Sequence, residues 1–143
     1  DGTTWGLMQS EAEPLADVTW GNGSWVAVGA AGSRIQSSNG IEWIDASSTE
    51  AVGWNSVIFN PNIGTEGLFL AVGDGGSWAY SSDGLAWAEE IPASRSSHPD
   101  LYSISYSATA IVAVGQGGAR LTLESSWLDS PCTVDCWNSF STE

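Results

Sequence analysis

Val-Ala-Val-Gly at 26–29 returns as Leu-Ala-Val-Gly at 70–73 and again as Val-Ala-Val-Gly at 112–115. The starts of the three copies lie 44 and 42 residues apart, a spacing that identifies a repeat protein. One such repeat cannot bury its own apolar face, so neighbouring copies must pack on one another. The function therefore has to be sought in a stack of repeats rather than in a single copy.

Each copy is predicted to hold four short strands. In the first copy an apolar run at 15–20, a strand at 25–28 and an alternating run at 33–38 precede a strand that carries Trp. An Asn-Gly or Asp-Gly pair comes before this last strand, and such pairs favour type I′ hairpin turns with positive φ at both central residues. Four strands in about 42 residues is the size of a propeller blade. We therefore expect an all-β chain of propeller-type blades with almost no helix.

The turn before the Trp-bearing strand resembles a known repeat. Ser-Ser-Asp-Gly-Leu-Ala-Trp at 81–87, with its counterparts at 37–43 and 1–5, resembles the Asp-box repeat of sialidase-type and photosystem-assembly-type β-propellers. The resemblance implies that the box forms the turn between the third and fourth strands of a blade and that its Trp packs between blades. The box residues are Asp1, Gly2, Trp5, Asn39, Gly40, Trp43, Asp83, Gly84 and Trp87.

The chain does not divide into whole blades: it is predicted to begin with the last strand of one blade and to contain a third blade that is short. We predict an orphan fourth strand at 1–9, blades at 15–47 and 54–91, a short third blade at 102–129 that lacks the turn pair, and a tail at 130–143. Because propellers typically close with four to eight blades, the chain is expected to be an incomplete propeller.

Two ways of completing the propeller are equally favoured by the sequence. In the first, further blades of the same precursor complete it, and the start at Asp1 indicates processing or excision. In the second, the strand at 3–9 is donated to the third blade of a second copy, covering an open sheet edge. A donation that does not close a ring would build a filament. A third alternative pairs 3–9 within its own chain, beside a weak strand at 126–129.

Acidic side chains dominate the charge. Seventeen acids stand against three arginines and no lysine, for a net charge of −14. This balance excludes nucleic acid and anionic membranes as partners, because both are bound through cationic contacts. Calcium is the one ion that the acids suggest, although they form no dense ligand pattern.

Several features favour an extracellular location. Cys132 and Cys136 are a candidate disulfide, and Asn22 begins a glycosylation sequon in a predicted turn. The absence of lysine fits the same location, and no apolar run is long enough to span a bilayer.

Catalysis is not expected. The sialidase chemistry that the resemblance raises needs an arginine cluster, a tyrosine nucleophile and an acid/base aspartate. Arg34 and Arg120 occupy equivalent repeat positions, but Trp78 replaces arginine between them. The tyrosines are expected in strands, with core or inter-blade roles: Tyr80, Tyr102 and Tyr106.

Tryptophan is the residue through which the chain would recognise a glycan or a partner. Those that recur once per copy are expected in the core: Trp5, Trp20, Trp25, Trp43, Trp87 and Trp127. Trp54, Trp78 and Trp137 are left as possible surface anchors, and Trp78 and Trp137 are the best candidates among them for a ligand or interface role. The sequence thus predicts a non-catalytic secreted module in an extracellular assembly, with a glycan-binding propeller segment and a sialidase-like hydrolase fragment as alternatives.

Overall fold

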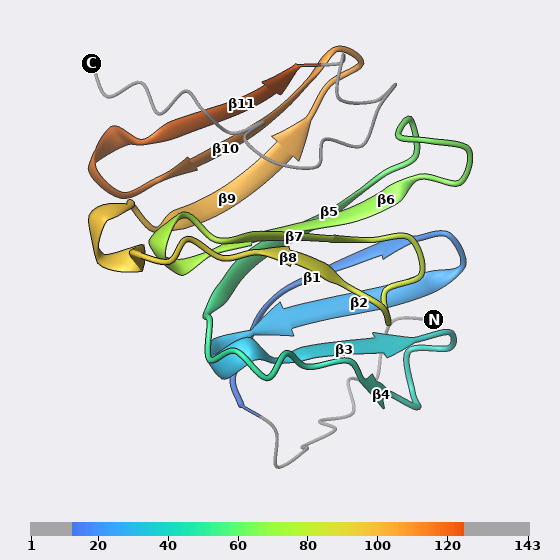
Figure 1. Ribbon diagram of the computed structural model, residues 1–143. Coiled ribbons are helices and arrows are strands. Elements are labelled where there is room, and N and C mark those ends of the chain that lie inside the picture. The colour runs from blue at the N-terminus through green and yellow to red at the C-terminus, as the bar shows by residue number, and fades with distance from the viewer. Residues whose placement is uncertain (1–12, 125–143) are drawn as a thin grey trace, which may run out of the picture.

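Consecutive antiparallel hairpins build three sheets in the computed structural model, which describes residues 13–124 (Figure 1). Blade 1 has the strand order β1-β2-β3-β4 and blade 2 the order β5-β6-β7-β8, while the described part of blade 3 holds β9, β10 and β11. The strands are β1 (Leu15–Gly21), β2 (Ser24–Gly29), β3 (Arg34–Ser37), β4 (Ile44–Asp45), β5 (Trp54–Asn60), β6 (Leu68–Gly73), β7 (Trp78–Ser81), β8 (Ala88–Glu90), β9 (Leu101–Tyr106), β10 (Ala110–Gly115) and β11 (Arg120–Glu124).

The sheets stack face to face with their first strands side by side. β1 contacts β5, and β5 contacts β9, whereas the outer strands of neighbouring blades make few contacts (Figure 1). This is the radial arrangement of propeller blades around the innermost strands. The expected fold class, an all-β incomplete propeller, is confirmed.

Two apolar cores lie between the sheets. Side chains alternate between the faces of a strand, so the repeated tetrapeptide serves both neighbours of a blade. In blade 2, Phe69 and Ala71 belong to the core shared with blade 1, while Leu70 and Val72 belong to the core shared with blade 3. We call these two sides of a blade the previous-blade face and the next-blade face.

The type I′ turn occurs at a different Asn-Gly pair from the ones predicted. Asn22 and Gly23 have φ of 46° and 75° and form the two-residue loop between β1 and β2. At the box turns only the glycines have positive φ, 73° at Gly40 and 77° at Gly84. The prediction of type I′ turns at the box pairs was therefore wrong, because side-chain hydrogen bonds impose another geometry there.

Helix is confined, within residues 13–124, to four 3₁₀ turns of three residues each: η1 (Ala30–Gly32), η2 (Asp74–Gly76), η3 (Arg95–Ser97) and η4 (Gln116–Gly118). Three of these turns follow the tetrapeptide in the three copies, so they are part of the repeat. Residues 1–9 and 130–143, predicted as an orphan strand and a tail, lie outside the described residues.

Candidate interaction surface

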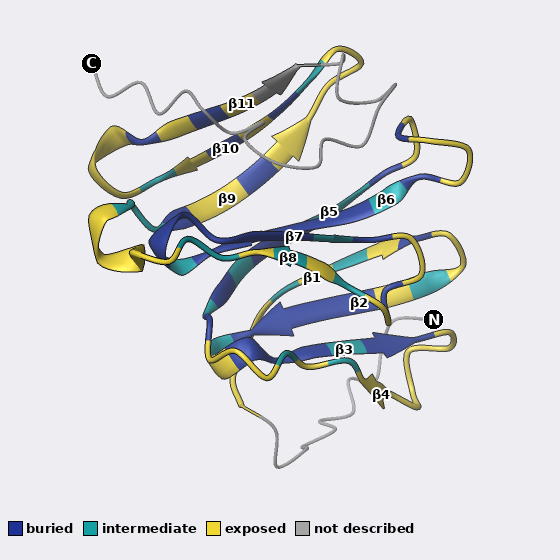
Figure 2. Cartoon of the chain, in the orientation of Figure 1, coloured by how far each residue is buried: buried dark blue, intermediate teal, exposed yellow. Residues whose placement is uncertain are grey.

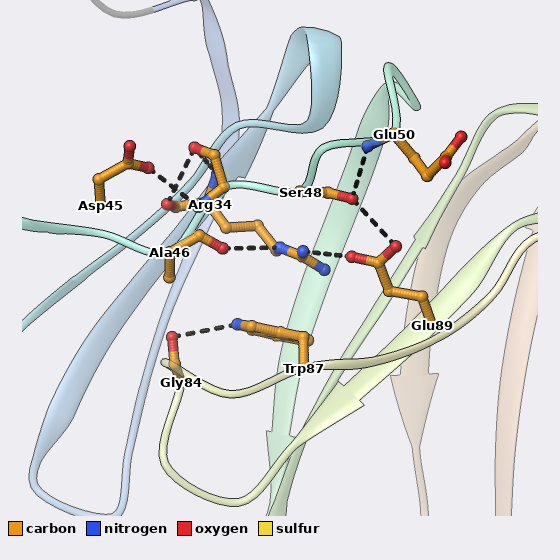
Figure 3. Close-up of polar contacts among 9 residues, drawn as sticks. Arg34, Asp45, Ala46, Ser48, Glu50, Gly84, Trp87 and Glu89 are labelled. Carbon is orange, nitrogen blue, oxygen red and sulfur yellow. Dashed lines mark hydrogen bonds and ion pairs between the residues drawn. The ribbon is translucent and has the colours of Figure 1, made fainter.

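An arginine clamp joins blade 1 to blade 2. Arg34, on β3, is almost fully buried and extends from the next-blade face of blade 1 (Figure 3). Its Nη2 donates to Oε1 of Glu89 on β8, and its Nε donates to the carbonyl of Ala46 at 3.3 Å. The second oxygen of Glu89 accepts from the Ser48 hydroxyl at 3.0 Å. The carboxylate of one blade is thereby tied to two segments of the other.

Two indole rings enclose the same guanidinium. Its central carbon lies 5.4 Å from the centroid of Trp54 and 5.0 Å from that of Trp87, both residues of blade 2. A cation over an indole face is attracted by the ring quadrupole. Burial lowers the pKa of Arg34, and the hydrogen bond and charge of Glu89 act in the opposite direction. Arg34 therefore stays charged at neutral pH, held by two rings and a carboxylate.

The box turn of blade 2 brings Trp87 to this clamp. The amides of Leu85 and Ala86 donate to Oδ1 of Asp83 at 2.8 and 2.9 Å, and the amide of Gly84 donates to the Ser81 hydroxyl. Trp87 then closes the turn by donating to the carbonyl of Gly84 at 3.1 Å (Figure 3). The turn lies between the third and fourth strands and its Trp packs between blades, as the resemblance implied.

Backbone donors also act on the charge of the box aspartate. Partial desolvation alone would raise the pKa of Asp83, but hydrogen bonds from the Ala86 and Leu85 amides and the Ser81 hydroxyl lower it below its ordinary value. In the equivalent turn of blade 1, Asn39 Oδ1 accepts from the Ile41 and Glu42 amides, both at 2.9 Å. The turn therefore needs an acceptor at this position and functions with or without charge.

The next-blade face of blade 3 is open. Val112 and Val114 are 38% and 44% exposed, whereas Val26 and Val28, their equivalents in blade 1, are both 0% exposed. Figure 2 shows the same contrast, with β2 buried along most of its length and β10 alternating between buried and exposed residues. Arg120 lies on this open face and is exposed.

The previous-blade face of blade 1 is open as well, which corrects three expectations of burial. Trp20, Trp25 and Trp43 are 48%, 38% and 37% exposed. Their equivalents Phe59, Phe69 and Trp87 belong to, or pack against, the core that blades 1 and 2 share. The three tryptophans are exposed because no described residue covers this face, not because their places in the repeat differ.

The edge of this open face carries an ionised acid. Asp45 is exposed, at the same place in β4 that Glu89 holds in β8. Hydrogen bonds from the side chain and the backbone of Ser47 lower the pKa of Asp45. Blade 1 therefore presents aromatic rings together with a carboxylate.

Trp78 lies between blades 2 and 3. It is 8% exposed, belongs to the core of that interface, and stacks on Tyr80 with centroids 5.7 Å apart and an interplanar angle of 21°. Its indole is therefore not a surface anchor for a soluble ligand. Trp137, the other candidate anchor, lies outside the described residues.

Each of the remaining predicted site residues is either exposed at the surface or lies outside the described residues. Tyr102 and Tyr106, expected in the core or between blades, are exposed. The box residues Asp1, Gly2 and Trp5, the core candidate Trp127 and the cysteines Cys132 and Cys136 lie outside the described residues. Asn22 is exposed at the tip of the β1–β2 turn, although its amide donates to the carbonyl of Ser82 at 3.2 Å. A glycan at Asn22 would leave its amide nitrogen a single N–H with which to keep that bond.

No arginine cluster or metal cluster accompanies these surfaces. Arg34 is buried in the clamp between blades 1 and 2, and Arg120 lies on the far side of blade 3, so the two do not meet. Across residues 13–124, no group of three His, Cys, Asp or Glu side chains is placed to hold a metal ion. In the same part of the chain, no helix has the length and apolarity that crossing a membrane requires.

Comparison with known proteins supports the fold. A solved structure of YCF48 bound to D1 peptide, a β-propeller protein, matches with a TM-score of 0.59 and 17% sequence identity. The match covers 76% of this chain and 36% of that one, so this chain spans about a third of the length of its structural relative. No family model matches the sequence, and no curated protein matches it. The Asp-box family therefore remains a resemblance.

The clamp itself was missed by sequence reasoning. Arg34 was considered only as part of a catalytic cluster, because its carboxylate partner lies 55 residues away in another blade. The sequence nonetheless contains a pattern that indicates the carboxylate partner. Aligning the copies places an acid two residues after the box Trp both at Asp45 and at Glu89.

Proposed function

We propose that the chain is a non-catalytic, secreted structural or interaction module that joins an extracellular assembly through its open blade faces. The observation that carries this proposal is the exposure of Val112 and Val114, at positions where blades 1 and 2 bury their residues completely or nearly so. Apolar side chains left exposed at positions that the other copies bury indicate a face that another protein surface covers. A stack of three blades is also fewer than the four to eight that close a propeller.

The proposed joining device combines face packing with strand exchange. In this scheme the strand at 3–9, which lies outside the described residues, completes blade 3 of a neighbouring chain. Since that strand precedes blade 1, the donation brings blade 1 of one chain next to blade 3 of another. An assembly that closes forms a ring, and one that does not close forms a filament.

An extracellular location is part of the proposal. It is supported by the charge of −14 without lysine, by the exposed sequon at Asn22 and by the cysteine pair. The peptide in the structure of the relative YCF48 is a property of that protein; here it makes protein recognition by a blade stack a reasonable expectation.

Glycan binding is the second candidate function, and the exposed tryptophans favour it. Trp20 and Trp25 form a tilted pair with centroids 5.0 Å apart on the open face of blade 1. Such rings can stack on sugar faces. A glycan array should then show binding that is lost on Trp25→Ala. Trp78→Ala is a poor probe, because that residue is buried.

Measurement of the molar mass by light scattering, across a range of protein concentrations, tests the proposal. We expect species of at least twice the 15.0 kDa of one chain. Deletion of residues 1–9 should abolish these species if strand exchange is the joining device. A well-folded monomer at every concentration would overturn the proposed function.

A further inference from the structure

The residues that hold Arg34 have repeat equivalents on the open face of blade 1. Glu89 pairs with Ala79 in blade 2, and Asp45 pairs with Ile35 at the same place in blade 1. Trp43 is likewise the counterpart of Trp87, and Leu15 that of Trp54. The previous-blade face of blade 1 thus presents an indole and a carboxylate in the arrangement that receives an arginine in blade 2.

The open face of blade 3 presents the matching arginine. Arg120 pairs with Val114 across β10 and β11, as Arg34 pairs with Val28 across β2 and β3. The apolar residues beside the two arginines are also equivalent, Val112 and Val114 in blade 3 and Val26 and Val28 in blade 1. Blade 3 therefore repeats the half of the clamp interface that blade 1 contributes.

We propose that a second copy of this chain covers the open face of blade 3 with its own blade 1, and that Arg120 enters a clamp formed by Trp43 and Asp45 of that copy. This inference rests on the proposed function and names its partner. The new interface repeats the contact between blades 1 and 2, with Val112 and Val114 packed against Val18, Trp20 and Trp25.

The aromatic residues of the open face are already arranged for this contact. Trp20 and Trp25 have a centroid distance of 5.0 Å and an interplanar angle of 58°. Phe59 and Phe69, their equivalents in the formed interface, have values of 4.9 Å and 55°. The docking surface therefore needs no rearrangement of its largest side chains.

Charge favours this pairing of faces over others. The chain has seventeen acids and only three cationic side chains, so two copies repel unless a cation meets an acid where they touch. Arg120 is one of those three cations, and Asp45 is an acid at the equivalent place on the other face. An arginine over an indole and beside a carboxylate gives the contact both energy and register.

Two copies are sufficient to satisfy both open faces. In a two-fold arrangement, blade 3 of each copy packs on blade 1 of the other, which gives six blades in one ring. Six lies within the usual range of four to eight blades, whereas a ring of three copies would have nine. With the three blades that residues 13–124 supply, a closed assembly of two copies therefore fits the usual blade number better than a ring of three.

A charge exchange tests this dimer. Native mass spectrometry of the full chain should show a dimer for the wild type and a monomer for Arg120→Asp and for Asp45→Arg, each of which places like charges at both contacts. Mixing the two variants should restore a dimer that contains one copy of each, because both of its contacts then pair an arginine with an aspartate. We expect at least a tenfold difference in dissociation constant between the mixture and either variant alone.

Matched controls carry the same charge changes away from both faces. Arg95→Asp, in η3, and Glu66→Arg, in the loop between β5 and β6, should remain dimeric. Circular dichroism should show the wild-type fold in all four variants, since the substituted side chains are exposed. An oligomer that both charge reversals leave intact would overturn this inference and leave the proposed function standing. A wild-type chain that is monomeric at all concentrations would overturn both.

Discussion

The tetrapeptides at 26–29 and 112–115 have the same four residues and opposite surroundings. Val26 and Val28 are completely buried against blade 2, while Val112 and Val114 are exposed on the far side of blade 3. Ala27 and Ala113 are both buried. Burial in a blade stack is therefore set by the neighbouring blade, and an exposed copy of a motif that is buried elsewhere indicates an interface whose partner is missing. Three pairs of substitutions and one single substitution use this comparison, each made in the Arg120→Asp background so that the stability of a single copy is measured.

The largest contrast is expected between Val28→Asp and Val114→Asp. An aspartate at 28 would place a second carboxylate in the core between blades 1 and 2, opposite an Arg34 that Glu89 already neutralises. The buried excess charge should cost about 3 kcal/mol or more, a large part of the stability of a domain. At 114 the same charge is solvated, but in this background it faces the aspartate at 120 across the strands, so the change should stay within about 1 kcal/mol. Urea unfolding followed by circular dichroism measures both. Equal losses would mean that the face of blade 3 is covered within the chain.

The second contrast separates the formed clamp from the open one. Glu89→Gln leaves the buried charge of Arg34 without a carboxylate and should cost about 2–4 kcal/mol, somewhat less than a fully buried pair because Glu89 is partly exposed. Asp45→Asn, at the equivalent place in blade 1, should change the free energy of unfolding by less than about 0.5 kcal/mol. Chemical denaturation curves of the two variants provide the measurement. A small effect at Glu89 would show that the clamp does not stabilise the contact between blades.

A third contrast concerns the glycines of the box turns. A Cβ at Gly84 would lie 2.5 Å from Cγ2 of Val26 in blade 1, whereas a Cβ at Gly40 would have its nearest neighbour, Nε1 of Trp25, at 3.6 Å. Both glycines have positive φ, so Gly84→Ala and Gly40→Ala share that penalty of about 1 kcal/mol. The clash should add about 1–3 kcal/mol at Gly84 alone. Thermal unfolding of the two variants gives the difference, which should vanish if blades 1 and 2 are not in contact there.

The smallest contrast is a pH dependence. Because the folded-state pKa of Asp83 is lowered, its contribution to stability is present above the unfolded value of about 3.9 and is lost as the pH falls through the folded value. Asp83→Asn keeps the acceptor, as Asn39 does in blade 1, but removes this titration. Stability measured from pH 6 to pH 2 should therefore fall less steeply in the variant than in its parent. Identical slopes would mean that the turn does not hold its aspartate ionised.

The stack of blades could be predicted from the sequence because its signals are local. The recurring tetrapeptide, the alternation of apolar residues and the box pairs predict an all-β propeller-type fold with a turn before the last strand of a blade. Local signals did not, however, predict which Asn-Gly pair forms a type I′ turn. Asn22-Gly23 and Asn39-Gly40 are the same dipeptide, but only the second has Ser37 two residues upstream, whose hydroxyl accepts from the Asn39 and Gly40 amides.

The candidate surface could not be predicted, because exposure depends on what lies beyond the repeat. Trp20, Trp25 and Trp43 were expected in the core since their equivalents are core residues, and Trp78 was a surface candidate because no aromatic residue recurs at its place in the other copies. The burial of the first three depends on whether a preceding blade is present, and that of Trp78 on whether a following blade is present. The sequence of one blade does not contain that information. The partners of Arg34 were equally hidden, because a contact between blades has no fixed spacing along the chain.

The exposed valines of blade 3, Val112 and Val114, form the interface that a second copy is proposed to cover. Paramagnetic relaxation of labelled valine methyl groups by a soluble probe measures this exposure directly. In the monomeric Arg120→Asp variant, Val112 and Val114 should relax strongly while Val26 and Val28 stay protected. After an equal amount of unlabelled Asp45→Arg is added, all four should be protected. Relaxation of Val112 and Val114 that does not change on mixing would contradict the account.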